Sequence, residues 1–154
     1  HVVDNPDNDI LVIMTGDGRI APVVEVLAAD KTADIAILRA KGNDFTALPV
    51  STEAPLGSKV RVLSHPDRHF YVLSEGIISR KYLDQGPRRM LGITADFAKG
   101  SSGAPVFNEY GNVIASVNNT QSTYYSIKNG VKDNLQMVFK NTVSMEHLLD
   151  LIEK

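Results

Sequence analysis

The sequence predicts an all-β protein, a barrel or sandwich of short strands that ends in one α-helix. Most apolar residues fall in short runs rich in Val and Ile, and turn residues separate these runs at the intervals typical of such folds. Only the C-terminal segment places apolar side chains at helical spacing. The 154 residues are 43% hydrophobic and include no cysteine, so we expect core packing alone to stabilise the fold.

The first unit, residues 1–57, is predicted to contain three strands, at 10–14, 20–28 and 35–38. The turn at 15–18 contains two glycines and indicates that the first two strands form a hairpin. The segment 49–57 carries two prolines and a glycine, which are typical of a linker. We therefore place the boundary between two units at residue 57.

The second unit, residues 58–140, is predicted to contain six strands: 59–63, 70–80, 90–94, 105–108, 113–117 and 135–139. Pro66 ends the first of these strands, because proline cannot donate a hydrogen bond to a ladder. Gly76 lies inside the second strand and indicates a bulge or bend there. Arg88 and Arg89 are expected in a solvated loop before the third strand.

The third segment, residues 141–154, is predicted to be a helix that packs back on the strands. Its apolar stripe has the spacing i, i+3, i+4 and i+7, at Met145, Leu148, Leu149 and Ile152. Three residues are candidate caps for its first turn: Asn141, Thr142 and Ser144.

Charge and hydropathy exclude several classes of partner. The formal net charge is −2, from 16 basic and 18 acidic residues, which provides no field for nucleic acid. No apolar run has the roughly 18 residues that span a bilayer, so we expect no membrane insertion. Without cysteine no thiolate metal site exists, and the histidines lack metal-ligand spacing. We therefore expect neither a metal nor any other cofactor.

The stretch 99–105 carries the strongest chemical signal. A serine that attacks a peptide carbonyl needs a tight turn that exposes its Oγ and backbone N–H groups that converge on the developing oxyanion. Ser102 fits the nucleophile, the N–H groups of Gly100 and Ser102 fit the oxyanion hole, and Gly103 allows the turn. On this motif alone, a Gly/Ser-rich hairpin loop is an equal alternative.

Two further residues complete a catalytic triad. His1 and Asp34 precede Ser102, and this chain order of His, Asp and Ser is that of chymotrypsin-type proteases. The histidine would take the serine proton, and the aspartate would orient the imidazole. Taken singly, Asp34 is explained as a strand-start cap and His1 as a terminal residue, but those explanations do not account for the three together.

These motifs resemble the trypsin-like serine proteases of the HtrA (Do-like) type along essentially the whole chain. The histidine motif 1–4, the aspartate segment 30–38, the nucleophile loop 100–105 and the following strand at 111–114 are all similar. The resemblance implies a double six-stranded β-barrel with a C-terminal helix. It also implies that the N-terminal barrel is incomplete here, because about two strands precede the histidine in the family.

The resemblance also suggests substrate-binding residues. Asp96 and Lys99 precede the nucleophile, and Ser116, Val117 and Asn118 lie where the family's edge segment pairs with substrate backbone. Asp96 has two interpretations: a buried acid that selects Arg or Lys before the scissile bond, or an acid of a surface loop. The segment 116–118 is alternatively an ordinary core strand.

The resemblance implies little about regulation. Ser101 stands where zymogen-activated relatives carry an aspartate, so we expect no activation by N-terminal cleavage of that kind. The family's typical PDZ domain is not expected in these 154 residues, which end just after the predicted helix, so regulation and trimerisation through such a domain are not assumed. The oligomeric state stays open, and the resemblance alone favours a secreted or periplasmic location.

The sequence thus predicts a serine endopeptidase that acts on protein or peptide substrates through an acyl-enzyme. Two alternatives belong to other classes. One is a catalytically impaired, protease-like module that binds peptides. The other is a copper oxidase in which the amino group and imidazole of His1 chelate the metal, which leaves the Ser102 and Asp34 motifs unexplained.

Overall fold

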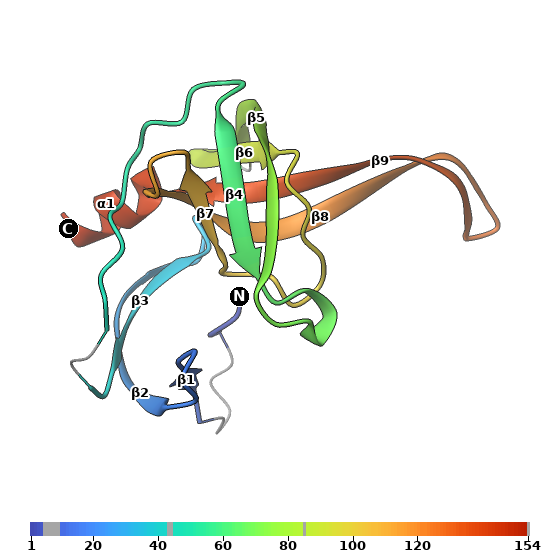
Figure 1. Cartoon of the computed structure of the whole chain (residues 1–154). Helices are drawn as coiled ribbons and strands as arrows, with labels where there is room; N and C mark the ends of the chain where they lie inside the picture. The colour runs from blue at the N-terminus through green and yellow to red at the C-terminus, as the bar shows by residue number, and fades with distance from the viewer. Residues whose placement is uncertain (5–9, 43–44, 85, 154) are drawn as a thin grey trace.

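The computed structural model describes residues 1–4, 10–42, 45–84 and 86–153. These residues form two antiparallel sheets and one C-terminal helix (Figure 1). The strands are β1 (Val12–Met14), β2 (Ile20–Asp30), β3 (Ile35–Ala40), β4 (Lys59–Ser64), β5 (Val72–Asp84), β6 (Arg88–Ile93), β7 (Pro105–Asn108), β8 (Val113–Lys128) and β9 (Val131–Ser144). A short 3₁₀ turn, η1, covers Pro66–Arg68, and helix α1 covers Glu146–Ile152. No helix among the described residues is both long and apolar enough to cross a membrane.

The first sheet contains β1, β2 and β3 in sequence order, all antiparallel. In the described part of the chain it does not close on itself, which agrees with the predicted incomplete N-terminal barrel. Its apolar side chains are largely exposed, as at Ile20, Val24 and Val26. The β2–β3 ladder has two register shifts, and the connection between these strands carries Asp34.

The second sheet is a closed six-stranded barrel with the order β4-β5-β6-β9-β8-β7. In β4 the buried positions alternate with exposed ones, because successive side chains point to opposite faces of a strand. The barrel interior is filled by branched and aromatic side chains, with Val60, Val62, Ile78, Leu91, Val106 and Ile114 each at most 2% exposed. This barrel therefore provides the rigid frame on which the nucleophile loop is mounted.

The strands β8 and β9 are much longer than predicted. The sequence indicates strands at 113–117 and 135–139, whereas the structure joins both into one hairpin that runs from Val113 to Ser144. The turn of this hairpin is Asn129-Gly130, both at positive φ (50° and 79°). Asn-Gly is the strongest short signal for a two-residue hairpin, but the strands that flank it are largely exposed on both faces, so no buried apolar face marks them in the sequence.

Two other local expectations need correction. The β4–β5 register continues unbroken through Gly76, and the shift in β5 falls between Ile78 and Arg80. Glycine is needed at position 76 for a different reason, since a Cβ there would lie 2.2 Å from the backbone nitrogen of Ala95. Arg88 and Arg89 open strand β6 and do not lie in a solvated loop.

Helix α1 is shorter than predicted, because β9 continues through Ser144. Of the three candidate caps, only Ser144 contacts the first turn, where its Oγ accepts a hydrogen bond from the Glu146 N–H at 3.3 Å. The helix packs against β2 and β3 of the first sheet and β6 and β9 of the barrel. It thus bridges the two sheets beside the connection that carries Asp34.

Candidate active site

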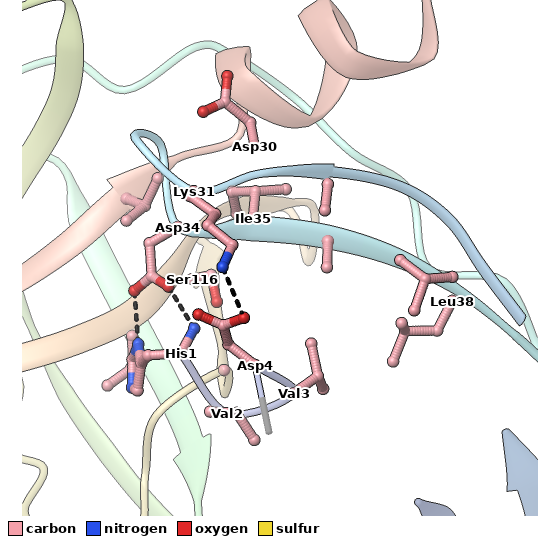
Figure 2. A pocket seen from close by; sticks show the side chains of 16 residues that line it. His1, Val2, Val3, Asp4, Asp30, Lys31, Asp34, Ile35, Leu38 and Ser116 are labelled. Carbon is pink, nitrogen blue, oxygen red and sulfur yellow. Dashed lines mark hydrogen bonds and ion pairs between the residues drawn. The ribbon is translucent and has the colours of Figure 1, made fainter. Parts of the chain in front are cut away.

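Asp34 and His1, the predicted acid and base, lie in direct contact (Figure 2). Asp34 lies just before β3, at the left-handed φ of 60°, and its side chain is only 14% exposed. Its Oδ2 lies 2.5 Å from His1 Nδ1, and its Oδ1 lies 2.5 Å from the amino nitrogen of His1. With the proton on Nδ1, this contact leaves Nε2 as the free acceptor of the imidazole.

Ser102 lies in the loop between β6 and β7. Its Oγ donates a hydrogen bond to the backbone oxygen of Asn118 at 3.2 Å. The Asn118 side-chain amide donates in turn to Asp34 Oδ2 at 2.6 Å. Asn118 therefore joins the nucleophile loop to the aspartate, whereas the described contacts include no hydrogen bond between Ser102 and His1.

The backbone of the nucleophile loop is shaped by two glycines. Gly100 and Gly103 have φ values of +93° and +85°, which favour glycine. A Cβ at Gly100 would lie 3.0 Å from the backbone oxygen of His65 in the turn before η1. The η1 turn itself also holds the loop, because the Asp67 N–H donates to the Lys99 carbonyl at 2.7 Å.

Two backbone N–H groups of this loop are unpaired. Within the described residues, the N–H groups of Gly100 and Ser102 have no acceptor, whereas those of Ser101, Gly103 and Ala104 all donate to backbone oxygens. Unpaired N–H groups beside a nucleophile are the donors that an oxyanion needs. The Ser101 side chain is buried and donates to Ser64 Oγ at 3.1 Å, which fixes the residue between these two groups.

Asp96 and Lys99 lie at the surface. The Asp96 side chain is 87% exposed, and its carboxylate pairs with Lys140 Nζ at 3.0 Å. The Lys140 side chain is only 14% exposed and also donates to the Phe97 carbonyl at 3.0 Å. This geometry matches the surface-loop interpretation of Asp96 and not a buried acid. Sequence reasoning missed Lys140, because β9 was not expected to reach this loop at that position.

The backbone hydrogen bonds of Ser116 and Val117 differ from those of Asn118. Ser116 pairs with β7 and β9, and both backbone groups of Val117 bond to the nucleophile loop, at Gly103 and Ala104, each at 2.9 Å. Neither residue has backbone groups left for a substrate strand. Asn118 follows directly, and its carbonyl faces Ser102, so the free edge of β8 begins at Asn118 and continues outward.

Arg88 is a buried residue of the site that sequence reasoning did not find. Its side chain is 11% exposed, with Nη2 3.6 Å from Asp34 Oδ2 and Nη1 3.9 Å from Asp84 Oδ2. Its Nε and Nη2 atoms have no hydrogen-bond partner among the described residues. The guanidinium therefore compensates the Asp34 charge through space from the barrel side.

Two cavities lie near the connection between β2 and β3, and Asp34 lines the larger one. The larger, of about 560 Å³, lies between the first sheet and the barrel and is lined by His1, Asp34 and apolar side chains of β2 and β3 (Figure 2). The smaller, of about 290 Å³, is lined by Arg88, Arg89 and His147. Burial, and then the charge of Arg89, lowers the pKa of His147, whose Nε2 accepts the Arg89 backbone N–H at 2.7 Å. The described residues contain no cluster of acids and histidines placed to hold a metal ion.

The closed barrel, the open sheet and the C-terminal helix give the chymotrypsin-like fold of the HtrA type. Residues 1–115 match the trypsin-like peptidase domain, and the chain belongs to this family. An uncharacterised protein of Sinorhizobium fredii, y4bJ, is 29% identical over 104 residues, which cover 65% of this chain and 16% of that protein.

Solved structures share the fold. The serine endoprotease from Yersinia pestis superposes with a TM-score of 0.70 at 17% identity and covers 96% of this chain and 49% of its own. The HtrA-type protease AlgW, solved with a decapeptide, gives a TM-score of 0.73 at 18% identity, over 94% of this chain and 43% of its own. The chain thus spans less than half of either solved protease and about a sixth of the curated relative.

Proposed function

We propose that the chain is a serine endopeptidase with Ser102 as nucleophile, His1 as general base and Asp34 as the residue that orients His1. The observation that carries this proposal is the contact of His1 Nδ1 with Asp34 Oδ2 at 2.5 Å, beside a serine that the same aspartate reaches through Asn118. The first unit, 1–57, would then contribute His1 and Asp34, and the second unit, 58–140, would contribute Ser102.

The reaction requires the Ser102 hydroxyl to change partners. Oγ would leave the Asn118 carbonyl and donate instead to His1 Nε2. Oγ then attacks the substrate carbonyl while Nε2 takes its proton, and the imidazolium is stabilised by Asp34. The unpaired N–H groups of Gly100 and Ser102 would bind the oxyanion.

The second half of the reaction reuses the same groups. His1 returns the proton to the leaving amine, and the chain then holds an acyl ester on Ser102. Water, deprotonated by Nε2, attacks this ester and restores the free serine. In this scheme Asn118 acts as a positioning residue, because its amide holds Asp34 and its carbonyl holds the resting Ser102.

A peptide-binding module is the second candidate. The observation in its favour is that Ser102 Oγ bonds to the Asn118 carbonyl and not to His1. Such a module would bind extended peptides at the free edge of β8 without cleaving them.

Labelling with a fluorophosphonate distinguishes the two candidates. We expect wild-type protein to form a covalent adduct at Ser102, found by mass spectrometry of the tryptic peptide, and Ser102→Ala to form none. Ser101→Ala is the matched control and should still label, because its hydroxyl is buried against Ser64. A folded wild-type protein that binds peptides and never labels would reject the endopeptidase in favour of the binding module.

A further inference from the structure

Arg88 approaches the same carboxylate oxygen that contacts His1. Its Nη2 lies 3.6 Å from Asp34 Oδ2, and that oxygen lies 2.5 Å from His1 Nδ1 and 2.6 Å from the Asn118 amide nitrogen. Arg88 comes from strand β6 of the barrel, whereas His1 and Asp34 belong to the first unit. The structure therefore places a positive charge of the barrel beside the aspartate that faces the proposed general base.

This positive charge is largely shielded from solvent. The Arg88 side chain is 11% exposed, so its charge is screened less than that of a surface arginine. Its Nε and Nη2 have no hydrogen-bond partner among the described residues. Buried donors without acceptors destabilise a fold. A structural role as a hydrogen-bond donor therefore explains this residue poorly, which leaves its charge as the property to explain.

The position of Arg88 is fixed from two sides. Asp84, its register partner on β5, has Oδ2 3.9 Å from Arg88 Nη1. Arg89, the next residue, donates its backbone N–H to His147 Nε2 at 2.7 Å, and its guanidinium pairs with two acids of α1. The start of β6 is thus held between β5 and α1, and the guanidinium beside Asp34 is held with it.

The other charged groups around His1 do not duplicate Arg88. Lys31 Nζ pairs with Asp4 Oδ1 at 2.9 Å, and both side chains are more than half exposed. Asp30 accepts the Ala33 N–H at 2.9 Å, and Figure 2 shows its side chain directed away from His1. The remaining charged neighbour is the amino group of His1 itself, which contacts the other oxygen of the Asp34 carboxylate.

The sign of the Arg88 charge determines its effect on His1. A carboxylate beside an imidazole stabilises the protonated, positive form, and a guanidinium nearby opposes this effect. Arg88 therefore favours the neutral imidazole. The neutral form is the one that can take a proton from a serine hydroxyl.

We propose that Arg88 is a positioning residue of the triad, which holds the Asp34 carboxylate and keeps His1 in its neutral, proton-accepting form in mildly acidic solution. This inference rests on the proposed function and adds the pH range over which the same site is active. The described ion pairs of Arg88 join it to Asp34 and Asp84 and to neither His1 nor Ser102, so it acts through Asp34.

The pH dependence of fluorophosphonate labelling tests the proposal. The labelling rate of Ser102 is measured from about pH 5 to about pH 9, and its acid limb reports protonation of the base in the free enzyme. Arg88→Gln removes the charge and keeps a hydrogen-bonding side chain. We expect the midpoint of the acid limb to rise by about one pH unit, which lowers labelling about tenfold at pH values well below the midpoint.

Two variants separate the charge of Arg88 from its packing. Arg88→Lys keeps the charge and should move the midpoint by less than about 0.3 pH unit. Arg89→Gln is the matched control, because that guanidinium pairs with Glu146 and Asp150 and not with Asp34, and it should also move the midpoint by less than about 0.3 unit. A merely structural role of Arg88 would lower labelling by the same factor at every pH and leave the midpoint in place.

Asp84→Asn tests the same idea with Arg88 in place. It removes a partly exposed acid that faces Arg88, so the guanidinium charge is less compensated and the midpoint should fall by about 0.2–0.5 pH unit. This shift is opposite in sign to that of Arg88→Gln. It decides the question even where Arg88→Gln does not fold.

Titration of the His1 imidazole by NMR gives a reading that needs no activity. The Cε1–Hε1 signal of His1 is assigned by its absence in His1→Gln protein. Its midpoint in Arg88→Gln should lie about one pH unit above that in wild-type protein.

Three outcomes would overturn the proposal. The first is an unchanged midpoint in Arg88→Gln, and normal labelling of wild-type protein would then leave the proposed function standing. The second is an equal upward shift in Arg89→Gln, and the third is an upward shift in Asp84→Asn. Failure of wild-type protein to label at any pH, with the shift of the His1 NMR titration retained, would reject only the peptidase.

Discussion

The buried pair of Asp34 and Arg88 allows a quantitative prediction. Two unit charges 3.6 Å apart interact by about 4.6 kcal/mol at an effective dielectric constant of about 20. Both side chains are less than 15% exposed, so solvent screens them little. Since Asp34 also contacts His1, and Arg88 also faces Asp84, we expect the measurable coupling to be smaller, about 1–3 kcal/mol.

A double-mutant cycle measures this coupling. Asp34→Asn keeps the shape of the side chain but removes its charge. The largely buried Arg88 guanidinium then has less negative charge beside it, which should lower the free energy of unfolding by about 2–4 kcal/mol. Arg88→Met removes the charge and should cost less, because the carboxylate keeps three other hydrogen-bond donors, two on His1 and one on Asn118. The double variant should lose less free energy of unfolding than the two single variants lose together. Urea denaturation of the four proteins gives the coupling from their free energies of unfolding.

Additivity within about 0.5 kcal/mol would refute this account, because groups that interact at 3.6 Å cannot behave as independent sites. Arg61→Met with Glu75→Gln is the matched control. That pair is closer, at 2.9 Å, but both side chains are about half exposed. We expect its coupling to be below about 1 kcal/mol.

The other predictions concern the loop, the surface acid and pH. Gly100→Ala should abolish fluorophosphonate labelling and cost about 1–2 kcal/mol in urea denaturation, because alanine is strained at φ +93° and its Cβ would press on the His65 carbonyl; full labelling would contradict the assigned oxyanion loop. Asp96→Asn should change the ratio of kcat/KM between substrates with Arg and with Val before the scissile bond by less than about twofold, because the carboxylate is exposed and paired with Lys140. A preference for Arg that the variant loses would show instead that Asp96 selects the substrate. Burial lowers the pKa of His147 below 6.5, so the unfolded chain binds the proton more readily and the free energy of unfolding falls as pH drops below about 6.5. His147→Gln should remove the contribution of His147 to the decrease in free energy of unfolding between pH 7.5 and 5.5, measured by urea denaturation. An unchanged pH dependence would show that His147 does not cause this decrease.

The strands with apolar alternation could be predicted from the sequence, because one face of each is buried. Val60 and Val62 are both fully buried, and their alternation with Lys59, Arg61 and Leu63 indicates a strand from the sequence alone. The part of the β8–β9 hairpin beyond the barrel, residues 119–139, has no buried face, so no core selects apolar residues on one side of it. Its only strong local signal is Asn129-Gly130.

The site was predictable to the extent that its chemistry is local. The serine with its glycines forms one loop, so the sequence contains the whole oxyanion motif. Arg88 and Asn118 reach Asp34 across 54 and 84 positions of the chain (88 − 34 and 118 − 34), and nothing in their local sequence indicates the contact. The pairing of Val117 with Gly103 and Ala104, which sets where the free edge begins, likewise depends on tertiary register.

His1 and Asp34 precede or connect the strands of the open sheet, whereas Asn118 and Arg88 lie in barrel strands and Ser102 in a barrel loop. The position of the proposed base relative to the proposed nucleophile therefore depends on how the open sheet packs against the barrel. If the proposed triad acts, a shift of the open sheet by about an ångström or two would leave the core of the barrel in place and still separate Asp34 and His1 from Ser102. Loss of peptidase activity would then precede detectable unfolding, and a small apolar molecule bound in the cavity of about 560 Å³, whose lining does not include Ser102, would inhibit the proposed reaction.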